Sequence, residues 1–381
     1  MPFRHRDAVE RWMFRAALPW WAAHGLDRQH GGYVEHMTLD GRDGAAPFKR
    51  TRVTARQIYV FSHAHVLGFG DGAELARHGA DFLTTRTWNG PQRGFARLLT
   101  RSGGELDPTP DLYDHAFCLH AFAWLYRATG DAAARDWMHR TLDFIERGLR
   151  HPSGEGFHDE LPPPGRRQQN PHMHLAEAAL ASHAATGEQR FADLARELAA
   201  MFARWFFDPT SATLGELFTE DWQRIPGDEG RRIEPGHHLE WAWILACCRR
   251  DLGIDLSEQI RAAVGFAERY GIDPVSRATF DVVRDDGVPL DRGSRTWPNT
   301  ERLKAAVAML ELDGTDPTTV FDETCALLLE RYLAHTPEGT WMDAFDGAGR
   351  PLAKTIPAST LYHLFLAFAE VLRVTAARPI G

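Results

Sequence analysis

The stretch FHDELPPPGR, residues 157–166, is one copy of a pattern that runs through the whole chain. Each copy has an aromatic residue, a few residues of strand character and a turn that contains Gly or Pro. The copies begin at Tyr33, Phe95, Phe157, Phe218, Phe280 and Trp341, at intervals of 62, 62, 61, 62 and 61 residues. A fixed period of this size is typical of repeat architectures, so we predict six similar units in the 381 residues.

The segments between these copies predict two helices per unit. We expect twelve helices, near residues 7–25, 51–68, 72–86, 113–129, 131–148, 172–186, 189–206, 237–251, 256–270, 297–312, 317–334 and 357–377. Connections after the even-numbered helices are short and carry Gly, in most cases before a residue that can cap the next helix, as at Gly130-Asp131. Connections after the odd-numbered helices are long and hold the turn pattern, so all long loops should emerge on one side.

The two sets of helices differ in polarity. Even-numbered helices are apolar nearly all round, as in FCLHAFAWLY (117–126), whereas odd-numbered ones carry charge on one face, as in QRFADLARELAAMFARW (189–205). A helix that is apolar all round is buried, and an amphipathic one faces water. We therefore predict an all-α fold, an (α/α)6 barrel of inner and outer helices with short β-hairpins in the long loops of one face. The uniform period predicts one domain over residues 1–381.

Composition excludes several classes of protein. Apolar residues make up 44% and charged residues 25% of the chain, as in ordinary globular proteins. The net charge of −9 argues against nucleic acids and anionic membranes as partners. The N-terminus lacks the apolar core of a signal peptide, and no apolar run is long enough to span a membrane. The four cysteines lie in predicted helices without zinc-site spacing, which favours buried thiols in a reducing cytoplasm.

Polar residues interrupt the apolar pattern near the start of the inner helices. They are Arg52 and Arg56, Tyr113 and His115, His172, His174 and Glu177, His237, His238 and Glu240, Trp297 and Glu301, and Tyr362 and His363. The inner helices should begin at the mouth, so their first turns converge on one cavity. Burying polar groups there costs free energy unless they are hydrogen-bonded or used.

For these polar residues of the inner helices, a structural role must be weighed against a functional one. A histidine in an apolar helix is more often a hydrogen-bonded core residue than a catalyst, and we interpret His63, His65, His120 and His183 in that way. For His237, His363 and His174 the concentration at one rim favours function, and Arg56 is expected to face the cavity. Tyr113 and Trp297 fit core packing equally well, and Glu240 also fits an ordinary helix contact.

A metal site is not favoured by these spacings. His172 and His174 are two residues apart on a helix and therefore point in different directions. The motif HExxH is absent, and His237 with Glu240 is an incomplete ligand set. We expect neither a metal nor an organic cofactor.

The residue types suit proton transfer beside a carbonyl group. Imidazole titrates near neutral pH and can remove and return a proton, and an arginine can stabilise an enediolate oxygen. Glycoside hydrolysis would require two carboxylates that flank the bond, and Asp111, Asp114, Glu240 and Glu301 keep that alternative open. A non-catalytic carbohydrate-binding toroid is a third alternative.

Six segments carry a resemblance to a known family. They are TARQ (54–57), LYDHAF (112–117), NPHMHLAEA (170–178), PGHHLEW (235–241), TWPNTE (296–301) and YHLF (362–365). With them the chain resembles the N-acylglucosamine 2-epimerase superfamily over essentially its whole length. The resemblance implies metal-free and cofactor-free sugar isomerisation or 2-epimerisation through a cis-enediolate.

The resemblance also implies roles for single residues. The two essential histidines correspond to His237 and His363, and the enediolate-stabilising arginine to Arg56. Positions that contact the substrate correspond to Tyr113, His174, Glu240 and Trp297, with Glu177 and Glu301 as further ones. The chain departs from the family pattern at Asn299, where many relatives have Gln, while Gln57 after Arg56 is as in the acylglucosamine epimerases.

Together these observations predict a cytoplasmic aldose–ketose isomerase, with D-mannose and D-fructose as the leading pair. A sugar 2-epimerase of the N-acylglucosamine, mannose/glucose or cellobiose type is the alternative within the family, and a glycoside hydrolase on the same barrel is the alternative outside it. The expected partner is a monosaccharide substrate, with no nucleic acid or membrane, and the expected assembly is a monomer or homodimer.

Overall fold

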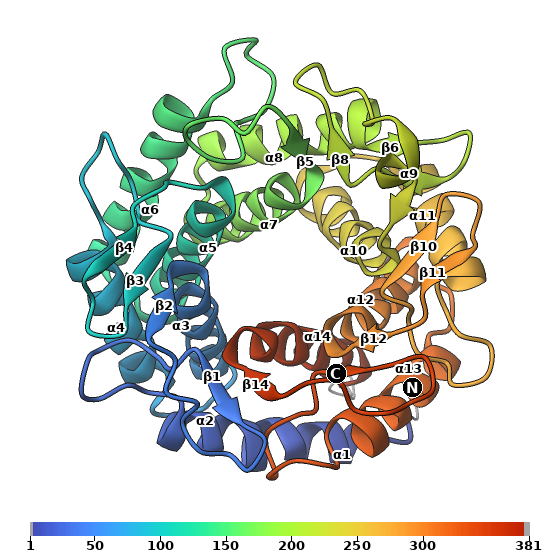
Figure 1. Ribbon diagram of the computed structural model, residues 1–381, viewed down its shortest axis with the longest axis horizontal. Helices are drawn as coiled ribbons and strands as arrows, with labels where there is room; N and C mark the ends of the chain where they lie inside the picture. The colour runs from blue at the N-terminus through green and yellow to red at the C-terminus, as the bar shows by residue number, and fades with distance from the viewer. Residues whose placement is uncertain (1–2, 377–381) are drawn as a thin grey trace, which may run out of the picture.

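Two concentric rings of helices form the protein, as a computed structural model of the chain shows for residues 3–376 (Figure 1). The inner ring consists of α3 (Thr51–Val66), α5 (Leu112–Thr129), α7 (Gln169–Thr186), α10 (Pro235–Leu252), α12 (Thr296–Asp313) and α14 (Leu361–Thr375). Each inner helix packs against the next, and α14 packs against α3 to close the ring. The predicted (α/α)6 barrel is confirmed.

The outer ring alternates with the inner one along the chain. It consists of α1 (Arg6–Arg11) with η1 (Trp12–Ala17) and α2 (Leu18–His24), α4 (Gly72–Phe82) with η2 (Leu83–Thr87), α6 (Ala132–Phe144) with η3 (Ile145–Leu149), α8 (Gln189–Met201) with η4 (Phe202–Phe206), α11 (Ser257–Tyr270), and α13 (Thr318–Leu327) with η5 (Leu328–Tyr332). The segments η1 to η5 are π-helical turns, which the sequence pattern did not predict.

Several inner helices end at the glycines that the sequence predicts as helix ends. The inner helices α5, α7, α10 and α12 end at Gly130, Gly187, Gly253 and Gly314, all in the left-handed conformation that glycine adopts without strain. The last predicted helix differs, because a short 3-10 turn, η6 (Ala358–Thr360), precedes α14. Its predicted end at residue 377 lies outside the described residues.

Short strands line the mouth side of the barrel. They are β1 (His36–Thr38), β2 (Phe48–Arg50), β3 (Leu98–Thr100), β4 (Glu105–Asp107), β5 (Arg167–Gln168), β6 (Phe207–Asp208), β7 (Thr213–Leu214), β8 (Leu217–Phe218), β9 (Arg232–Ile233), β10 (Val282–Arg284), β11 (Pro289–Asp291), β12 (Ser294–Arg295), β13 (Ala344–Phe345) and β14 (Thr355–Pro357). One further helical turn, α9 (Gly227–Gly230), lies in the loop before α10.

The strands pair in two ways. Two of the six expected hairpins occur as paired strands, β3–β4 in the second copy and β10–β11 in the fifth, and β6–β7 is a further hairpin that lies before the fourth copy. The other pairs, β2–β3, β5–β8, β9–β10, β12–β13 and β1–β14, join the loops of neighbouring units. The last of these joins the first unit to the sixth, and an isolated bridge between Asp111 and Glu160 joins the second unit to the third, so the loops form a closed ring around the mouth (Figure 1).

The interior of the double ring is apolar, as the helix polarity predicts. The largest fully buried side chains include Trp21, Trp241 and Trp341, and all four cysteines are buried and free. Within residues 3–376 no helix combines the length and apolar character needed to cross a membrane.

Candidate active site

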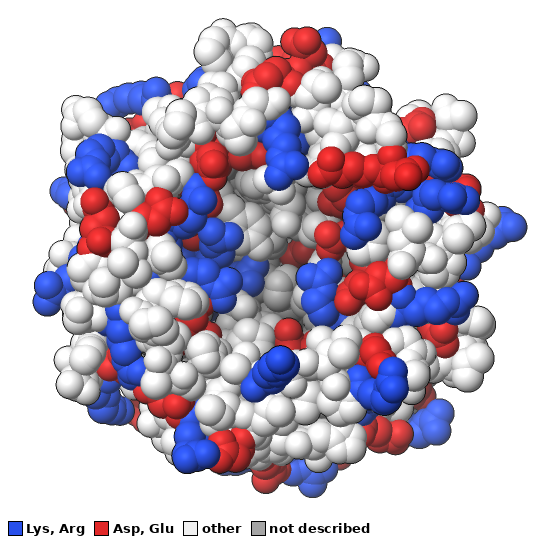
Figure 2. All heavy atoms as spheres, in the orientation of Figure 1, with Lys and Arg blue, Asp and Glu red and all other residues white. Residues whose placement is uncertain are grey.

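A cavity of about 360 Å³ opens at the mouth of the barrel, where the inner helices begin. Figure 2 shows it as a central hollow with side chains of both charge signs around its rim. Seven of the residues singled out in the sequence line it: Arg56, Tyr113, His174, His237, Glu240, Trp297 and His363. Other lining residues include Arg50, Asn170, Glu234, Arg295, Asp343 and Thr360. Segments more than 300 residues apart in the chain thus meet around one space.

Each of two cavity histidines is held by a carboxylate at Nδ1. Nδ1 of His237 lies 2.8 Å from Oε2 of Glu216, and Nδ1 of His363 lies 2.8 Å from Oε1 of Glu301. Both rings also contact the indole of Trp297, with ring centroids 5.2 and 5.6 Å away. With Nδ1 engaged on both rings, Nε2 is the nitrogen of each that remains for a ligand in the cavity.

The first turn of α10 lets the indole approach this closely. Pro235 begins the helix, where its missing N–H costs no hydrogen bond. Gly236 follows, and a Cβ at that position would lie 2.6 Å from the Trp297 ring. The PGHH segment therefore leaves room for the Trp297 ring to pack beside His237.

The two histidines have opposite protonation tendencies. Burial alone would lower the pKa of His237, but the carboxylates of Glu216, Glu234 and Glu240 outweigh it and raise that pKa to about 9. Burial lowers the pKa of His363 well below its usual value, and the nearby cations of Arg56 and Lys304 lower it further. At neutral pH these shifts favour an imidazolium at His237 and a neutral imidazole at His363.

Arg56 enters the cavity as a cation that no carboxylate neutralises within residues 3–376. Its Nη2 donates a hydrogen bond of 2.6 Å to the hydroxyl of Tyr113, and its guanidinium lies over the Phe117 ring at 4.3 Å. The buried Nε has no hydrogen-bond partner there. An aromatic frame of this kind holds the guanidinium in place and leaves its charge available to an anionic group.

Glu177 and Glu301 lie behind the cavity wall rather than on it. Oε2 of Glu177 accepts a short hydrogen bond from the Tyr362 hydroxyl and lies 3.3 Å from Nδ1 of His174. Glu301 is fully buried beneath His363. Each of these two carboxylates therefore touches a lining histidine.

A buried lysine that the sequence analysis did not single out supports this wall. Nζ of Lys304 lies 2.6 Å from Oε2 of Glu301 and 3.7 Å from Oε1 of Glu240, and all three side chains are at most 1% exposed. Burial and the Glu240 carboxylate raise the pKa of Glu301, while the Lys304 ammonium acts in the opposite direction. Lys304 is held charged by these carboxylates.

Three of the mouth histidines face away from the cavity. Nε2 of His115, His172 and His238 accepts the backbone N–H of Phe95, Phe157 and Leu214, respectively. Burial lowers the pKa of His115 and His238 to about 4, so both rings are neutral, as an accepting nitrogen requires. These residues fasten the mouth loops to the inner helices.

Asn299 fastens a mouth loop to an inner helix in the fifth unit, as the three histidines do in other units. Its Oδ1 accepts the N–H of Thr279, and its amide group donates to Ser294 and Arg295. The departure from the family pattern at this position therefore lies in loop attachment, outside the cavity lining.

Three groups of side chains have a composition that can hold a metal ion. Two belong to the cavity wall, His174 with Glu177 and Glu240, and Glu240 with Glu301 and His363. In both, each carboxylate already has Lys304 or a histidine as an ion-pair partner.

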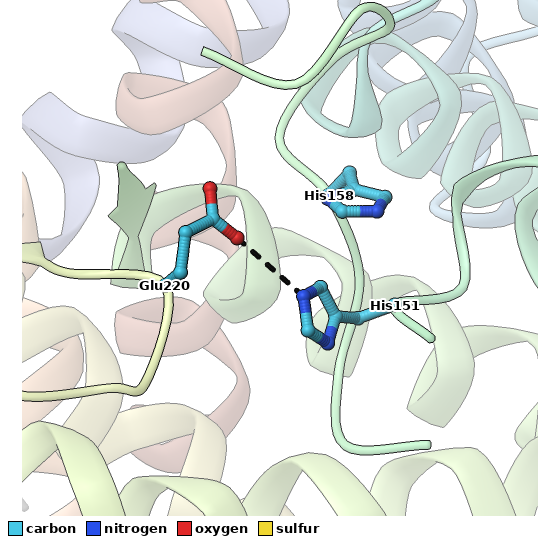
Figure 3. Close-up of side chains that lie close together, drawn as sticks. All are labelled: His151, His158 and Glu220. Carbon is cyan, nitrogen blue, oxygen red and sulfur yellow. Dashed lines mark ion pairs between the residues drawn. The ribbon is translucent and has the colours of Figure 1, made fainter. Parts of the chain in front are cut away.

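The third group, His151, His158 and Glu220, lies in the loops (Figure 3). Nδ1 of His151 accepts the N–H of Ser153, which leaves the proton on Nε2, 3.4 Å from Glu220. The buried guanidinium of Arg167 lies 3.7 Å from the same carboxylate. A cation is therefore already present beside this group.

Known proteins match this chain over most of its length. The model of the N-acylglucosamine 2-epimerase (GlcNAc 2-epimerase) family matches residues 31–367. The mannose-6-phosphate isomerase of Rhizobium meliloti is 33% identical over 371 residues, 94% of this chain and 95% of that protein. The D-mannose isomerase of Thermobifida fusca is 27% identical over 334 residues, 81% of this chain and 80% of that protein.

A solved structure shows the shared fold. The cellobiose 2-epimerase from Bacillus thermoamylovorans B4167 superposes with a TM-score of 0.89 at 18% identity, over 97% of this chain and 99% of that one. The resemblance inferred from the six sequence segments is confirmed by these matches. This chain belongs to the N-acylglucosamine 2-epimerase family, whose members are isomerases and epimerases.

Proposed function

We propose that the protein is an aldose–ketose isomerase that interconverts D-mannose and D-fructose. The observation that carries the proposal is the pairing of a protonated His237 with a neutral His363 on one cavity wall. An acid and a base that differ in this way can act in the same proton-transfer reaction at neutral pH. The D-mannose isomerase among the relatives supports the choice of substrate.

His363 acts as the base in this mechanism. Glu301 accepts the Nδ1–H of His363, which leaves the Nε2 lone pair of that ring for the sugar. Nε2 takes the proton from C2 of the open-chain aldose, and the electron pair of that C–H bond forms the C1–C2 double bond as negative charge moves to O1. Arg56 stabilises the resulting cis-enediolate.

His237 acts on the oxygens. Its imidazolium first opens the sugar ring by giving a proton to O5 and taking the O1 proton in return, and it then protonates O1 of the enediolate. The neutral ring that results takes the proton from O2, so the C2 carbonyl forms as His363 returns its proton to C1. Atoms and charges balance, and the enzyme ends in its starting state. Tyr113, His174, Glu240 and Trp297 bind the sugar, while Glu177 and Glu301 act through His174 and His363.

A neutral sugar suits the cavity better than a sugar phosphate. Of the arginines that line it, Arg50 is paired with Glu35, and Arg295 is paired with Glu234 and Asp281. That leaves Arg56, at the reacting atoms, as the lining arginine without a carboxylate. Because the 33% identical relative is a mannose-6-phosphate isomerase, D-mannose and D-mannose 6-phosphate must be compared directly.

The acid, base and charge stabilisation of this mechanism come from side chains, so we propose that it needs no metal or organic cofactor. We also propose one domain over residues 1–381 and, from the four free buried cysteines, a cytoplasmic location. Activity that survives exhaustive chelation supports the first point, and strong inhibition that added metal reverses contradicts it.

The reaction is tested by incubation in deuterated water with D-mannose, D-mannose 6-phosphate, D-glucose, N-acetylmannosamine and cellobiose. We expect fructose from mannose, with solvent deuterium at C1. Conversion to an epimer with deuterium at C2 would identify the 2-epimerase alternative, for which His237 would protonate C2 from the opposite face. Release of new reducing ends without carbon-bound deuterium would identify a hydrolase.

A further inference from the structure

A second cavity, of about 330 Å³, lies at the opposite end of the barrel. The inner helices begin at the mouth, and residues late in α3, α5, α7, α10 and α14 line this far cavity. Its volume is close to that of the mouth cavity, about 360 Å³. Nothing in the proposed reaction takes place there.

Buried polar groups without partners mark its inner end. His120 is 4% exposed, and neither of its ring nitrogens makes a hydrogen bond within the described part of the chain. Oε1 of Glu177, a residue that is also 4% exposed, has no partner either. Because a buried polar group without a partner costs free energy, these atoms favour a ligand that supplies both donors and acceptors.

The histidines of the far cavity are neutral. Burial lowers the pKa of His63 to about 3 and that of His120 to about 4. A neutral ring offers one donor and one acceptor, and Nδ1 of His63 is already 2.9 Å from the Tyr59 hydroxyl. The expectation from sequence that His63 and His120 are hydrogen-bonded core residues is therefore wrong for His120.

The side chains of the walls and outer rim indicate which kind of ligand fits the far cavity. Trp124, Trp243, Leu180 and Leu366 give the cavity apolar surfaces. Toward the rim Arg250 pairs with Asp251 and Arg373 pairs with Glu370, while Arg127 lies over the Trp124 ring. A carboxylate lies at the inner end, so an anionic ligand is disfavoured. Aromatic faces combined with unpaired donors and acceptors are the features that bind a neutral sugar.

We propose that the far cavity is a second binding site for a neutral monosaccharide. Hydroxyl groups of the sugar donate to Oε1 of Glu177 and hydrogen-bond with His120, and its C–H face packs against Trp243, because His63 and Arg127 already lie against the Trp124 ring. Glu177 also connects the two cavities, because its other oxygen contacts Tyr362 and His174. A sugar in the far cavity therefore contacts the same carboxylate that positions a residue of the mouth cavity.

Fluorine NMR of the full chain labelled with 5-fluorotryptophan tests this site by binding alone. D-mannose and D-mannitol are the probes, since mannitol lacks a carbonyl group and cannot react. Replacement of single tryptophans by Phe assigns the signals of Trp124, Trp243 and Trp297. We expect saturable shifts of Trp124 and Trp243, which line the far cavity, in addition to that of Trp297, which lines the mouth cavity.

Two variants and one control decide the location. Ala181→Phe places a ring in the far cavity, and His120→Leu removes the unpaired nitrogens at similar size; each should weaken the response of Trp124 and Trp243 at least tenfold. Ala185→Phe, on the same helix but outside the cavity lining, should leave it unchanged. Shifts of Trp297 alone, or far-cavity shifts that survive both variants, would overturn the proposal whatever the catalytic activity.

Discussion

The carboxylate of Glu216 lies 2.8 Å from Nδ1 of His237, although the two residues come from different structural elements. Glu216 follows β7 in the long loop before α10, and it also accepts hydrogen bonds from the side chain of Gln169 and the N–H of Glu234. A carboxylate fixed in this way holds the imidazole in one orientation and favours its protonated form. The acidic partner of His237 is therefore supplied by the mouth loops.

Opposite protonation of the two histidines predicts the pH profile. His237 must carry a proton, and its pKa is raised to about 9, so kcat/KM should fall as the pH rises through about 9. His363 must be neutral, and its pKa is lowered, so the acid limb should lie well below pH 6.5. Measurements of kcat/KM from pH 4 to 10.5 check this.

One cavity carboxyl group serves as the control for that profile. Burial raises the pKa of Asp343 to about 6, so Asp343→Asn shows whether any limb near pH 6 belongs to this residue. A steep loss of wild-type activity between pH 7 and 8 would contradict the assignment of His237 as the acid.

Replacement of Glu216 should move the alkaline limb. Glu216→Gln keeps the size of the side chain and removes the charge that raises the pKa of His237. We expect the limb to shift to lower pH by about 1 to 2 pH units, with a smaller effect on kcat/KM at pH 6 than at pH 8. Glu220→Gln, in the same loop but beside His151, is the matched control. An unchanged limb in Glu216→Gln would show that other groups set this pKa.

The adjacent residues His237 and His238 should separate catalysis from stability. If His237 and His363 transfer protons as proposed, His237→Ala and His363→Ala should each lower kcat by about 10²- to 10⁴-fold in a folded protein. His238 fastens Leu214, so His238→Ala should cost about 1–3 kcal/mol of unfolding free energy and retain much more activity. Steady-state kinetics measure turnover, and urea unfolding measures stability. Near-normal turnover of His237→Ala or His363→Ala would rule out the proposed catalytic role of that histidine.

Lys304 should contribute to both catalysis and stability. Lys304→Met leaves the buried carboxylates of Glu301 and Glu240 without their cation, and breaking such a pair costs about 3–5 kcal/mol. We also expect a lower kcat, because Glu301 then loses the ion pair that holds it in place beneath His363. Lys304→Arg should restore part of the kcat at unchanged KM if the charge is what matters. Equal stability of wild type and Lys304→Met would contradict the buried ion pair.

Much of this architecture could be predicted from the sequence because it repeats. The turn pattern gave the number of units, the all-round apolar helices identified the inner ring, and polar residues in their first turns identified the mouth. His237, His363 and Arg56 were found because a polar side chain stands out against an apolar helix. The same signal also drew attention to His115, His172 and His238, whose side chains face the loops.

Other features depend on contacts that no local pattern records. Glu216 resembles any acidic loop residue until the chain folds back over α10. Lys304 lies in the middle of a helix, where a lysine would ordinarily reach solvent, and only the neighbouring carboxylates make its burial tolerable. The pairing of strands across units and the unpaired nitrogens of His120 likewise follow from the closed geometry of the barrel.

The pairing of β1 with β14 has a consequence for protein engineering. Because the first and sixth units are joined as neighbours in the ring, the order in which the units are connected is not fixed by their packing. A circular permutant in which a flexible linker joins the natural ends and the chain is opened at the short Gly187 turn should assemble the same toroid. Gene fusions and split-protein reporters can accordingly be attached on the side of the barrel away from the mouth.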